Sequence, residues 1–259
     1  MSYANILFDI SGGIARLTLN RPNKLNSFTA AMHEEVREAV ARVGKETGVR
    51  VLLLTGAGRG FCAGQDLADL GEGRVDLGLQ VERYYAPLVL ALRALPLPVV
   101  CAVNGVAAGA GANLALACDL VIAKKSASFI QSFAKLGLIP DTGGTYQLPR
   151  LVGTARAMGL ALLGDKLSAE QAAQWGLIWK CYDDEVFGAE IEKLLVHLAA
   201  APTLGLARTK RAIYSSAGAT LLDQLDVERD AMRDLGYSED YREGVEAFLN
   251  KRAPVFHGR

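Results

Sequence analysis

The stretch from Ala94 to Cys118 contains no Asp, Glu, Lys or Arg, and it is long enough to cross a bilayer. Its interior is interrupted by prolines, glycines and asparagines, namely Pro96, Pro98, Asn104, Gly105, Gly109, Gly111 and Asn113. Such residues end helices or place turns, so a buried strand, a turn and a buried helix fit better than one lipid-facing helix. We therefore expect this stretch to lie in a protein core.

Strand-like and helix-like segments alternate up to about residue 185. Residues 6–10 and 14–19 predict a β-hairpin, because a Ser-Gly-Gly turn joins two strand-like runs. Apolar residues at helical spacing predict a helix from Thr29, a good N-cap, to about Lys45. Buried strands are expected at residues 51–55 and 99–103. This alternation predicts an α/β fold whose inner strands are covered on both faces.

Beyond about residue 185 the strand signals stop and helical patterns remain. The expected helices span residues 186–199, 202–215, 221–235 and 239–250. No long linker or internal repeat separates them from the preceding sequence. We therefore expect a core over residues 1–200 and a helical C-terminal region over residues 201–259, which packs on the core or on a neighbouring molecule.

The charge balance and the cysteine spacing narrow the protein class. Basic and acidic residues number 28 each, so no net field draws the chain to nucleic acid or to an anionic membrane, and neither is expected as a partner. The cysteines lie far apart, which argues against a zinc site or a disulfide framework and favours reduced, buried thiols. The N-terminal residues lack a basic segment followed by an apolar run, so we expect a cytoplasmic protein.

Several common catalytic motifs are absent from the sequence, among them a Walker phosphate loop and a Gly-x-Ser-x-Gly nucleophile elbow. The only histidines are His33, His197 and His257, too scattered to suggest a metal site or a Ser-His-Asp triad. The run Thr55-Gly-Ala-Gly-Arg-Gly60 is similar to a dinucleotide-binding turn, but Phe61 stands where the third glycine belongs. We therefore expect no metal and no nicotinamide cofactor.

Asp141 is a candidate for proton transfer; it lies in the segment Leu136-Gly-Leu-Ile-Pro-Asp-Thr-Gly-Gly-Thr145. The segment predicts a Gly/Pro turn just before a helix. An Asp in this position is typical of a helix N-cap, whose oxygen is taken by backbone amides. The alternative is a carboxylate that stays free to move a proton beside a carbonyl group. The local sequence leaves both interpretations open.

Two glycine-rich turns precede Asp141, at residues 61–66 and 104–111, and each follows a predicted strand. Glycine lets the backbone approach another group closely, so each turn can offer one free backbone N–H. Two such donors around one oxygen form an oxyanion hole. Tight packing of a helix on a sheet is the other explanation for these glycines.

Four motifs in order carry a family resemblance: Phe61-Cys-Ala-Gly-Gln-Asp66, Ala102-Val-Asn-Gly-Val-Ala-Ala-Gly-Ala-Gly111, Ala117-Cys-Asp-Leu-Val-Ile-Ala123 and Gly137-Leu-Ile-Pro-Asp-Thr-Gly-Gly-Thr145. Together they resemble the crotonase (enoyl-CoA hydratase/isomerase) superfamily. The likeness runs from Asn20 to Phe256, so it covers nearly the whole chain. It implies a crotonase-like spiral of ββα units and a helical C-terminal oligomerisation region, with the protein a homo-oligomer, either a trimer or a dimer of trimers.

In that superfamily two backbone N–H groups bind the thioester carbonyl of an acyl-CoA substrate. By motif position they would belong here to Gln65 and Ala110, and because CoA is part of the substrate no separate cofactor is implied. Hydratases carry two glutamates, whose positions hold Asn113 and Phe133 here, and neither side chain can activate water as a base. Asp141 stands where some isomerases hold a catalytic aspartate. The resemblance thus implies an isomerase in which Asp141 moves a proton between two carbons.

Within the superfamily the sequence looks most like the 1,2-epoxyphenylacetyl-CoA isomerases, which convert a ring epoxide to an oxepin-CoA in phenylacetate degradation. Residues 140–145, 156–164 and 175–179 carry this likeness. A Δ3,Δ2-enoyl-CoA isomerase or an enoyl-CoA hydratase of fatty-acid oxidation is the main alternative. A dehalogenase of aromatic acyl-CoA would need a histidine base. A non-catalytic RNA-binding or scaffold relative fits the balanced charge poorly.

The resemblance also implies a substrate and CoA site lined by Lys24, Leu25, Ala63, Asp66, Asn113, Phe133 and Lys251. The phosphates of CoA need local positive charge, which Lys24 would supply together with Lys251, the latter from an adjacent subunit. Exposed lysines are otherwise ordinary solvated surface. Pocket width, and so the choice between aromatic and linear acyl groups, would depend on Tyr84, Tyr85 and Phe133.

Overall fold

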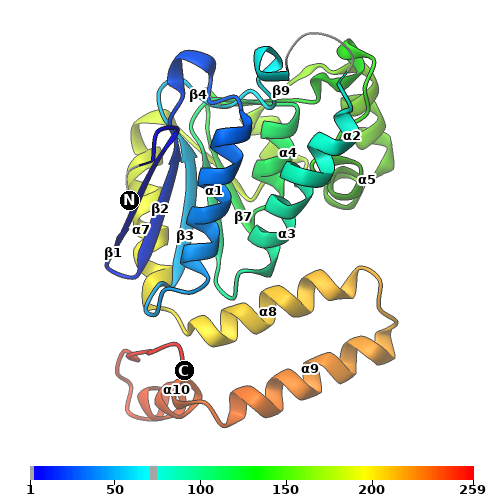
Figure 1. Ribbon diagram of the computed structural model, residues 1–259. Coiled ribbons are helices and arrows are strands. Elements are labelled where there is room, and N and C mark those ends of the chain that lie inside the picture. The colour runs from blue at the N-terminus through cyan, green and yellow to red at the C-terminus, as the bar shows by residue number, and fades with distance from the viewer. Residues whose placement is uncertain (1–2, 71–74) are drawn as a thin grey trace.

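The computed structural model describes residues 3–70 and 75–259 (Figure 1). Its larger sheet has the strand order β1-β2-β3-β5-β7-β10. The first two strands form the predicted antiparallel hairpin, and the other neighbouring pairs are parallel. These strands span Ile6–Ser11, Ile14–Leu19, Val51–Gly56, Val99–Val103, Leu120–Lys124 and Lys180–Tyr182.

A smaller sheet has the strand order β4-β6-β8-β9. Its strands are short and span Gly60–Cys62, Val106–Ala108, Ser128–Ile130 and Lys166–Ser168. β4, β6 and β8 run parallel to one another, whereas β9 is antiparallel to β8. In Figure 1 this sheet lies at the top of the molecule, above the larger sheet.

The chain passes between the two sheets in a repeating order. β3, β5 and β7 of the larger sheet are followed directly by β4, β6 and β8 of the smaller one, and a helix or helical turn comes next. These successive ββα units confirm the spiral that the family resemblance implies. Because β4, β6 and β8 are neighbours, the loops that leave them meet at one edge of the smaller sheet.

Helices cover both faces of the larger sheet, as the alternating pattern predicts. On one face Phe187 and Leu195 of α7 pack against Val51, Val100 and Ile122. On the other face lie α1, α3 and α4 (Figure 1). The α-helices span Ala30–Val43, Leu77–Gln80, Ala86–Ala94, Ala110–Leu116, Gly144–Leu163, Ala169–Gln174, Asp184–Ala200, Thr203–Ser216, Leu221–Gly236 and Glu239–Leu249, labelled α1 to α10. Shorter helical segments are η1 (Pro22–Lys24), η2 (Leu67–Leu70), the π-helical η3 (Val81–Tyr85) and η4 (Ser132–Leu136).

Helix α1 shows how local sequence sets an element. The side chain of Thr29 accepts a hydrogen bond from the backbone N–H of Met32 at 3.3 Å, which is the predicted N-cap. The apolar residues at helical spacing are all buried: Met32, Val36, Val40 and Val43. The helix ends at Val43, two residues before the expected Lys45, with Gly44 at its C-cap.

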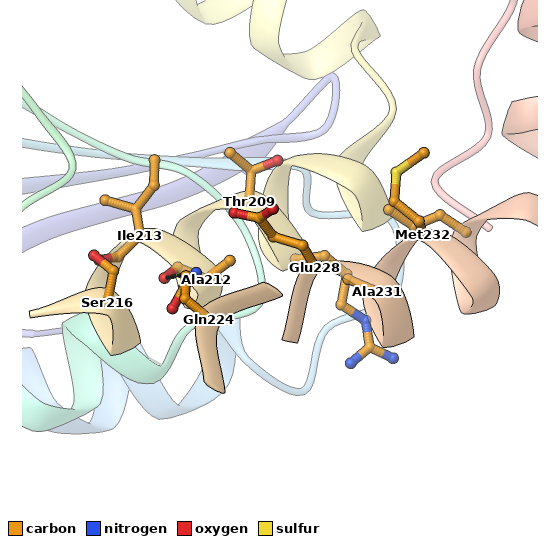
Figure 2. Close-up of a pocket in the computed structure, with 10 residues that line it drawn as sticks. Thr209, Ala212, Ile213, Ser216, Gln224, Glu228, Ala231 and Met232 are labelled. Atoms are coloured by element: carbon orange, nitrogen blue, oxygen red, sulfur yellow. Dashed lines mark hydrogen bonds between the residues drawn. The ribbon is translucent and has the colours of Figure 1, made fainter. Parts of the chain in front are cut away.

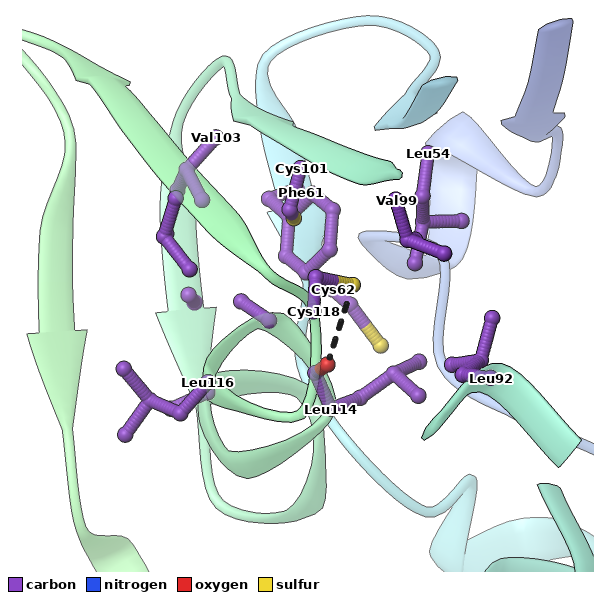
Figure 3. Packing of buried hydrophobic residues seen from close by; sticks show 14 of the residues in the cluster. Leu54, Phe61, Cys62, Leu92, Val99, Cys101, Val103, Leu114, Leu116 and Cys118 are labelled. Atoms are coloured by element: carbon purple, nitrogen blue, oxygen red, sulfur yellow. Dashed lines mark hydrogen bonds between the residues drawn. The ribbon is translucent and has the colours of Figure 1, made fainter. Parts of the chain in front are cut away.

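The charge-free stretch forms the core of the fold. It supplies β5, β6 and α4, and Figure 3 shows Val99, Cys101 and Leu114 in the same buried cluster as Phe61. Cys62, Cys101 and Cys118 are buried and Cys181 is half-buried, as expected for most of the thiols, and their reduced state stays an expectation. Burial raises the pKa of the Cys62 thiol to about 12, so this side chain is a neutral packing group.

The last helices leave the core at Ala200 and run beneath it in Figure 1. Together with α7, these three helices match the four expected C-terminal helical stretches within about two residues. Arg50 attaches this region to the core, because its side chain donates hydrogen bonds to the hydroxyl of Thr203 at 2.9 Å and to the carbonyl of Phe256 at 3.0 Å. A boundary between two domains at residue 200 stays an expectation.

Candidate active site

The first glycine-rich turn leaves strand β4 and holds Gln65 in an extended bridge with Phe28. Phe28 donates its N–H to the carbonyl of Gly64 at 2.7 Å, and its carbonyl accepts from the N–H of Asp66 at 2.9 Å. These two bonds fix the main chain on either side of Gln65. Within the described residues the N–H of Gln65 itself has no hydrogen-bond acceptor.

The second turn places Ala110 as the first residue of helix α4. The preceding Gly109 has φ 53° and ψ −129°, a conformation that favours glycine. The N–H of Ala110 lies in the first turn of the helix, where the helix offers it no acceptor, and no other described residue takes it up. This N–H is therefore free to bind a ligand oxygen.

Glycines bring the two turns into contact. A Cβ at Gly64 would lie 3.2 Å from the backbone nitrogen of Ala110, and a Cβ at Gly111 would lie only 2.3 Å from the carbonyl oxygen of Cys62. Backbone thus packs on backbone where any larger residue would clash. The two unpaired N–H groups of Gln65 and Ala110 belong to touching segments, as an oxyanion hole requires.

Asp141 lies between η4 and α5 and does not cap the helix. Gly143 occupies the N-cap of α5, which has no side-chain cap, and the Asp141 carboxylate accepts from the hydroxyl of Thr142 at 2.8 Å. The helix-cap interpretation is therefore wrong. Burial raises the pKa of Asp141, and the Thr142 bond lowers it by less. No salt bridge to Asp141 occurs in the part of the chain that is described. A carboxylate with these surroundings is suited to accept a proton.

Asn113 and Phe133 stand at the two positions where hydratases carry glutamates. The side chain of Asn113 is fully buried and donates from Nδ2 to the main-chain carbonyl of Asp141 at 2.9 Å. Phe133 lies beside the second glycine turn, since a Cβ at Gly109 would be 3.8 Å from its Cζ. These contacts place α4, η4 and the Asp141 turn around one site, with Asp141 as its carboxylate.

Tyr85 makes a contact to Gln65 that no sequence motif predicts. Its hydroxyl donates to the side-chain oxygen of Gln65 at 3.0 Å, and its ring meets His33 edge-on at 4.4 Å between centroids. Burial raises the pKa of Tyr85, as do the nearby Cys62 and Asp141, so the phenol stays neutral. Burial also lowers the pKa of His33 to about 3, which makes it a neutral packing group.

The residues expected to hold CoA fall into two places. Leu25 accepts from the N–H of Ala63 at 2.9 Å, and Asp66 forms a 2.9 Å salt bridge with Arg21, so the loop that contains Lys24 packs on the first glycine turn. Burial raises the pKa of Asp66, but bonds from Arg21 and the backbone of Ala68 outweigh it and the pKa is lowered. Lys24 is exposed beside this turn.

Lys251 is not brought to the site within one chain. It follows α10, which lies below the core in Figure 1, whereas β4 and its loop lie at the top. Its expected contact with CoA therefore requires a second subunit. A groove between α8 and α9, lined by Thr209, Ile213 and Met232 among others, also lies in this lower region (Figure 2). It holds none of the residues described above.

The sequence signature of the enoyl-CoA hydratase/isomerase family matches residues 9–259. The chain belongs to this family. It is 57% identical to the 1,2-epoxyphenylacetyl-CoA isomerase of Escherichia coli (strain K12), over 98% of both chains. It is also 48% identical over the full length of both chains to a Rhodobacter capsulatus protein named "Probable enoyl-CoA hydratase".

Solved structures of family members have the same fold. The crystal structure of an enoyl-CoA hydratase from Bacillus anthracis superposes with a TM-score of 0.92 at 32% identity, over 99% of this chain and 100% of the other. The α/β spiral with its helical C-terminal region is thus the family fold. Because the family includes hydratases and isomerases, the reaction must be argued from the residues at the site.

Two features of residues 3–70 and 75–259 bear on metal ions and membranes as possible partners. No group of three or more His, Cys, Asp or Glu side chains in these residues is placed to hold a metal ion. Neither α5 nor any other helix in these residues combines the length and apolar character needed to cross a membrane.

Proposed function

We propose that this protein is an acyl-CoA isomerase in which Asp141 moves a proton beside the thioester. The observation that carries the proposal is the surroundings of Asp141: a largely buried carboxylate that caps no helix, next to two touching turns with unpaired N–H groups. In this mechanism the N–H groups of Gln65 and Ala110 bind the thioester oxygen. Asp141 removes a proton from the carbon next to the carbonyl, and the negative charge moves onto that oxygen.

The same carboxyl group then returns the proton to another carbon. For a linear 3-enoyl-CoA this step shifts the double bond from the 3,4 to the 2,3 position, so no atom is gained or lost. Hydration would instead require a base that activates a water molecule, and Asn113 and Phe133 stand at the positions where family hydratases carry glutamates. One carboxylate is enough for isomerisation.

We further propose 2-(1,2-epoxy-1,2-dihydrophenyl)acetyl-CoA as the substrate, with the oxepin-CoA as product in phenylacetate catabolism. The 57% identity to the Escherichia coli isomerase supports this choice over a linear substrate. The buried ring of Phe133 beside Gly109 and the Tyr85 contact with Gln65 add aromatic surface suited to a ring. A Δ3,Δ2-enoyl-CoA isomerase or a hydratase is the alternative, and the name of the Rhodobacter relative supports the hydratase.

CoA belongs to the substrate in this proposal, and no separate cofactor takes part. Lys24 supplies positive charge for the CoA phosphates beside the first glycine turn, and Lys251 does so from an adjacent subunit. We propose a trimer or a dimer of trimers, because α8 and α9 contain no buried residue and expose large apolar side chains such as Ile213 and Met232. We propose that the enzyme acts in the cytoplasm, without nucleic acid or membrane.

The direct test follows the ultraviolet absorbance of a conjugated 2-enoyl-CoA while a 3-enoyl-CoA is incubated with the protein. We expect wild type to produce this absorbance and Asp141→Asn to lose it by at least about a hundredfold, since the amide cannot accept the proton. Asp165→Asn, at an exposed aspartate, is the matched control.

Two further incubations separate the alternatives. Crotonyl-CoA hydration should be negligible, and the ring epoxide should be converted faster than the linear 3-enoyl-CoA. Rapid hydration would favour the hydratase alternative, and isomerisation that survives Asp141→Asn would exclude the proposed mechanism. A salt-sensitive gel shift with RNA would revive the non-catalytic alternative.

A further inference from the structure

Two buried amide side chains, Gln131 and Asn113, form a chain of hydrogen bonds that ends at the main chain of Asp141. Nε2 of Gln131 donates to Oδ1 of Asn113 at 2.8 Å, and Nδ2 of Asn113 donates to the carbonyl oxygen of Asp141 at 2.9 Å. Asn113 has no exposed surface and Gln131 only 3%. Neither side chain is therefore open to solvent.

The direction of both hydrogen bonds follows from the acceptor at the end. A main-chain carbonyl oxygen can only accept, so Asn113 must turn its NH₂ group toward Asp141. Its Oδ1 then faces Gln131, which must donate. The Asp141 carbonyl thus fixes the orientation of the Asn113 amide, and Asn113 Oδ1 fixes that of Gln131; in return, the bond from Gln131 holds the Asn113 side chain in place.

That turn needs to be held, because its backbone is strained. Thr142 has φ 53°, in the left-handed region that β-branched residues avoid, at a cost of order 1–3 kcal/mol. The carbonyl of Asp141 accepts a second bond, from the N–H of Gly144 at 2.8 Å. Together the two donors fix the peptide group that carries the Asp141 side chain.

Gly144 also makes room for Asn113. A Cβ at Gly144 would lie only 2.3 Å from Nδ2 of Asn113, closer than atoms can pack. The first residue of α5 is therefore shaped to the Asn113 amide. The contact between Gly144 and Nδ2 of Asn113 therefore depends on the shape of the asparagine side chain.

We propose that Asn113, held in place by its hydrogen bond from Gln131, is the positioning residue that aims the Asp141 carboxylate at the substrate. The inference rests on the proposed function, in which Asp141 moves the proton. It adds that position 113 must carry a neutral hydrogen-bond donor. An ionised carboxylate there could not donate to the Asp141 carbonyl and would place a second negative charge beside the catalytic one. Asp141 chemistry and an ionised carboxylate at position 113 are then mutually exclusive.

Few titratable groups of the described chain lie near Asp141, so a change in its titration reports on the proposed role of Asn113. The side chains shown to lie near the turn, Asn113 of α4 and Phe133 of η4, are neutral, and α5 begins there with Gly144, which has no side chain. From η3, Tyr85 is the titratable group close enough for the Asp141 charge to raise its pKa. No charged side chain contributes to the shift of the Asp141 pKa.

Two variants of nearly equal size, Asn113→Asp and Asn113→Leu, separate positioning from packing. Both should reduce kcat by about ten- to a hundredfold with little change in KM, because a displaced base slows the chemical step and leaves CoA binding intact. Wild type should lose activity only at low pH, where Asp141 is protonated. Asn113→Leu should keep this profile at a lower level.

Asn113→Asp should instead give a bell-shaped profile. When protonated, the new carboxyl group can still donate to the Asp141 carbonyl, and when ionised it cannot, so activity should fall again at high pH. Gln131→Glu, which removes the Nε2 donor without changing size, should reduce kcat as Asn113→Leu does. Gln174→Glu, at an exposed position, adds the same charge as a control.

A measurement that needs no turnover separates this inference from the proposed function. The Asp141 carboxyl carbon can be titrated by NMR in ¹³C-aspartate-labelled protein, its signal assigned by its loss in Asp141→Asn. Asn113→Asp should raise the apparent pKa of this signal. If wild type isomerises neither a 3-enoyl-CoA nor the ring epoxide but the signal still shifts, the proposed function fails, and what stands is that the Asn113 hydrogen bond controls the Asp141 turn.

The opposite result would overturn the inference. If Asp141-dependent isomerisation is observed, yet the Asn113 and Gln131 variants change only the melting temperature and leave kcat, the pH profile and the Asp141 titration as in wild type, the amides are structural. If the Asn113 variants do not fold, Gln131→Glu decides the question by the same readouts.

Discussion

Helices α4 and α9 show how differently the core and the C-terminal region use their residues. All seven residues of α4 are buried, and one of them, Asn113, reaches Asp141. None of the sixteen residues of α9 is buried, although Leu222 and Met232 are large and apolar. Contacts within the chain bury α4 completely, whereas the large apolar side chains of α9 are not covered by any other part of the described chain. Helix α4 should therefore tolerate few substitutions, and α9 should be sensitive to substitution only where a second molecule packs on it.

The largest effect is expected where glycine turns touch in the core. Gly111→Ala puts a Cβ 2.3 Å from the carbonyl oxygen of Cys62, a backbone atom that cannot rotate away, so we expect a loss of more than about 3 kcal/mol in the free energy of unfolding. Gly205→Ala in α8, where a Cβ meets nothing within 4 Å, should stabilise by up to about 1 kcal/mol. Urea unfolding of both variants measures the contrast, and equal effects would contradict it.

The next effect concerns the attachment of α8 to the core. Nζ of Lys210 lies 2.9 Å from Oδ2 of Asp119, and both side chains are largely buried. Asp119→Asn leaves the lysine charge without its partner and should cost about 3–5 kcal/mol. Asp234→Asn, which breaks the exposed pair with Arg208, should cost less than about 1 kcal/mol. A similar loss in both variants would show that the buried pair does not hold α8.

A charge on the exposed face of α9 tests whether a second copy covers it. Met232→Glu should shift the protein from trimer or hexamer toward monomer, because the glutamate would be buried at the interface. Lys45→Glu, at an exposed position on the surface of the part before residue 200, should leave the assembly unchanged. Sedimentation analysis measures the mass of each variant. A wild-type monomer would refute the proposed assembly, and α9 would then be solvated.

The smallest effect concerns the stability of the Asp141 turn. Because burial raises the pKa of Asp141 in the folded state, the folded protein holds this proton more tightly than the unfolded chain does. The contribution of the group to stability is therefore full below the ordinary Asp pKa and is lost as pH rises through the raised value. Asp141→Asn should thus melt slightly higher than wild type at neutral pH, and the gap should close in acid. If the difference in melting temperature grew on acidification, the pKa of Asp141 would be lowered in the folded state and not raised.

The sequence predicts most of the fold because its local signals agree with one another. Thr29 caps the helix it was expected to cap, and the hairpin and the C-terminal helices lie within a few residues of their expected ends. The glycines at 64, 109 and 111 also indicated close backbone approach, which the contacts between the turns explain. Short-range patterns of this kind need no knowledge of tertiary structure.

The side-chain network behind the site could not be predicted in this way. Tyr85 bonds Gln65 across twenty residues, and Gln131 bonds Asn113 across eighteen, with no spacing rule that links them. The sequence suggested Asn113 as a substrate contact, and the structure shows its amide committed to Gln131 and Asp141. Direction of a side chain within a packed core depends on all its neighbours at once.

The unpaired N–H groups of Gln65 and Ala110 have a consequence for how such a site can be found by genetics. They are main-chain groups, so alanine scanning deletes neither: Ala110 is already alanine, and at position 65 only the side chain that Tyr85 contacts would be lost. A tolerance map of this gene would therefore under-report the two proposed oxyanion-hole donors. Replacing either amide by an ester through semisynthesis removes one N–H and keeps every side chain, which makes the donors visible to experiment.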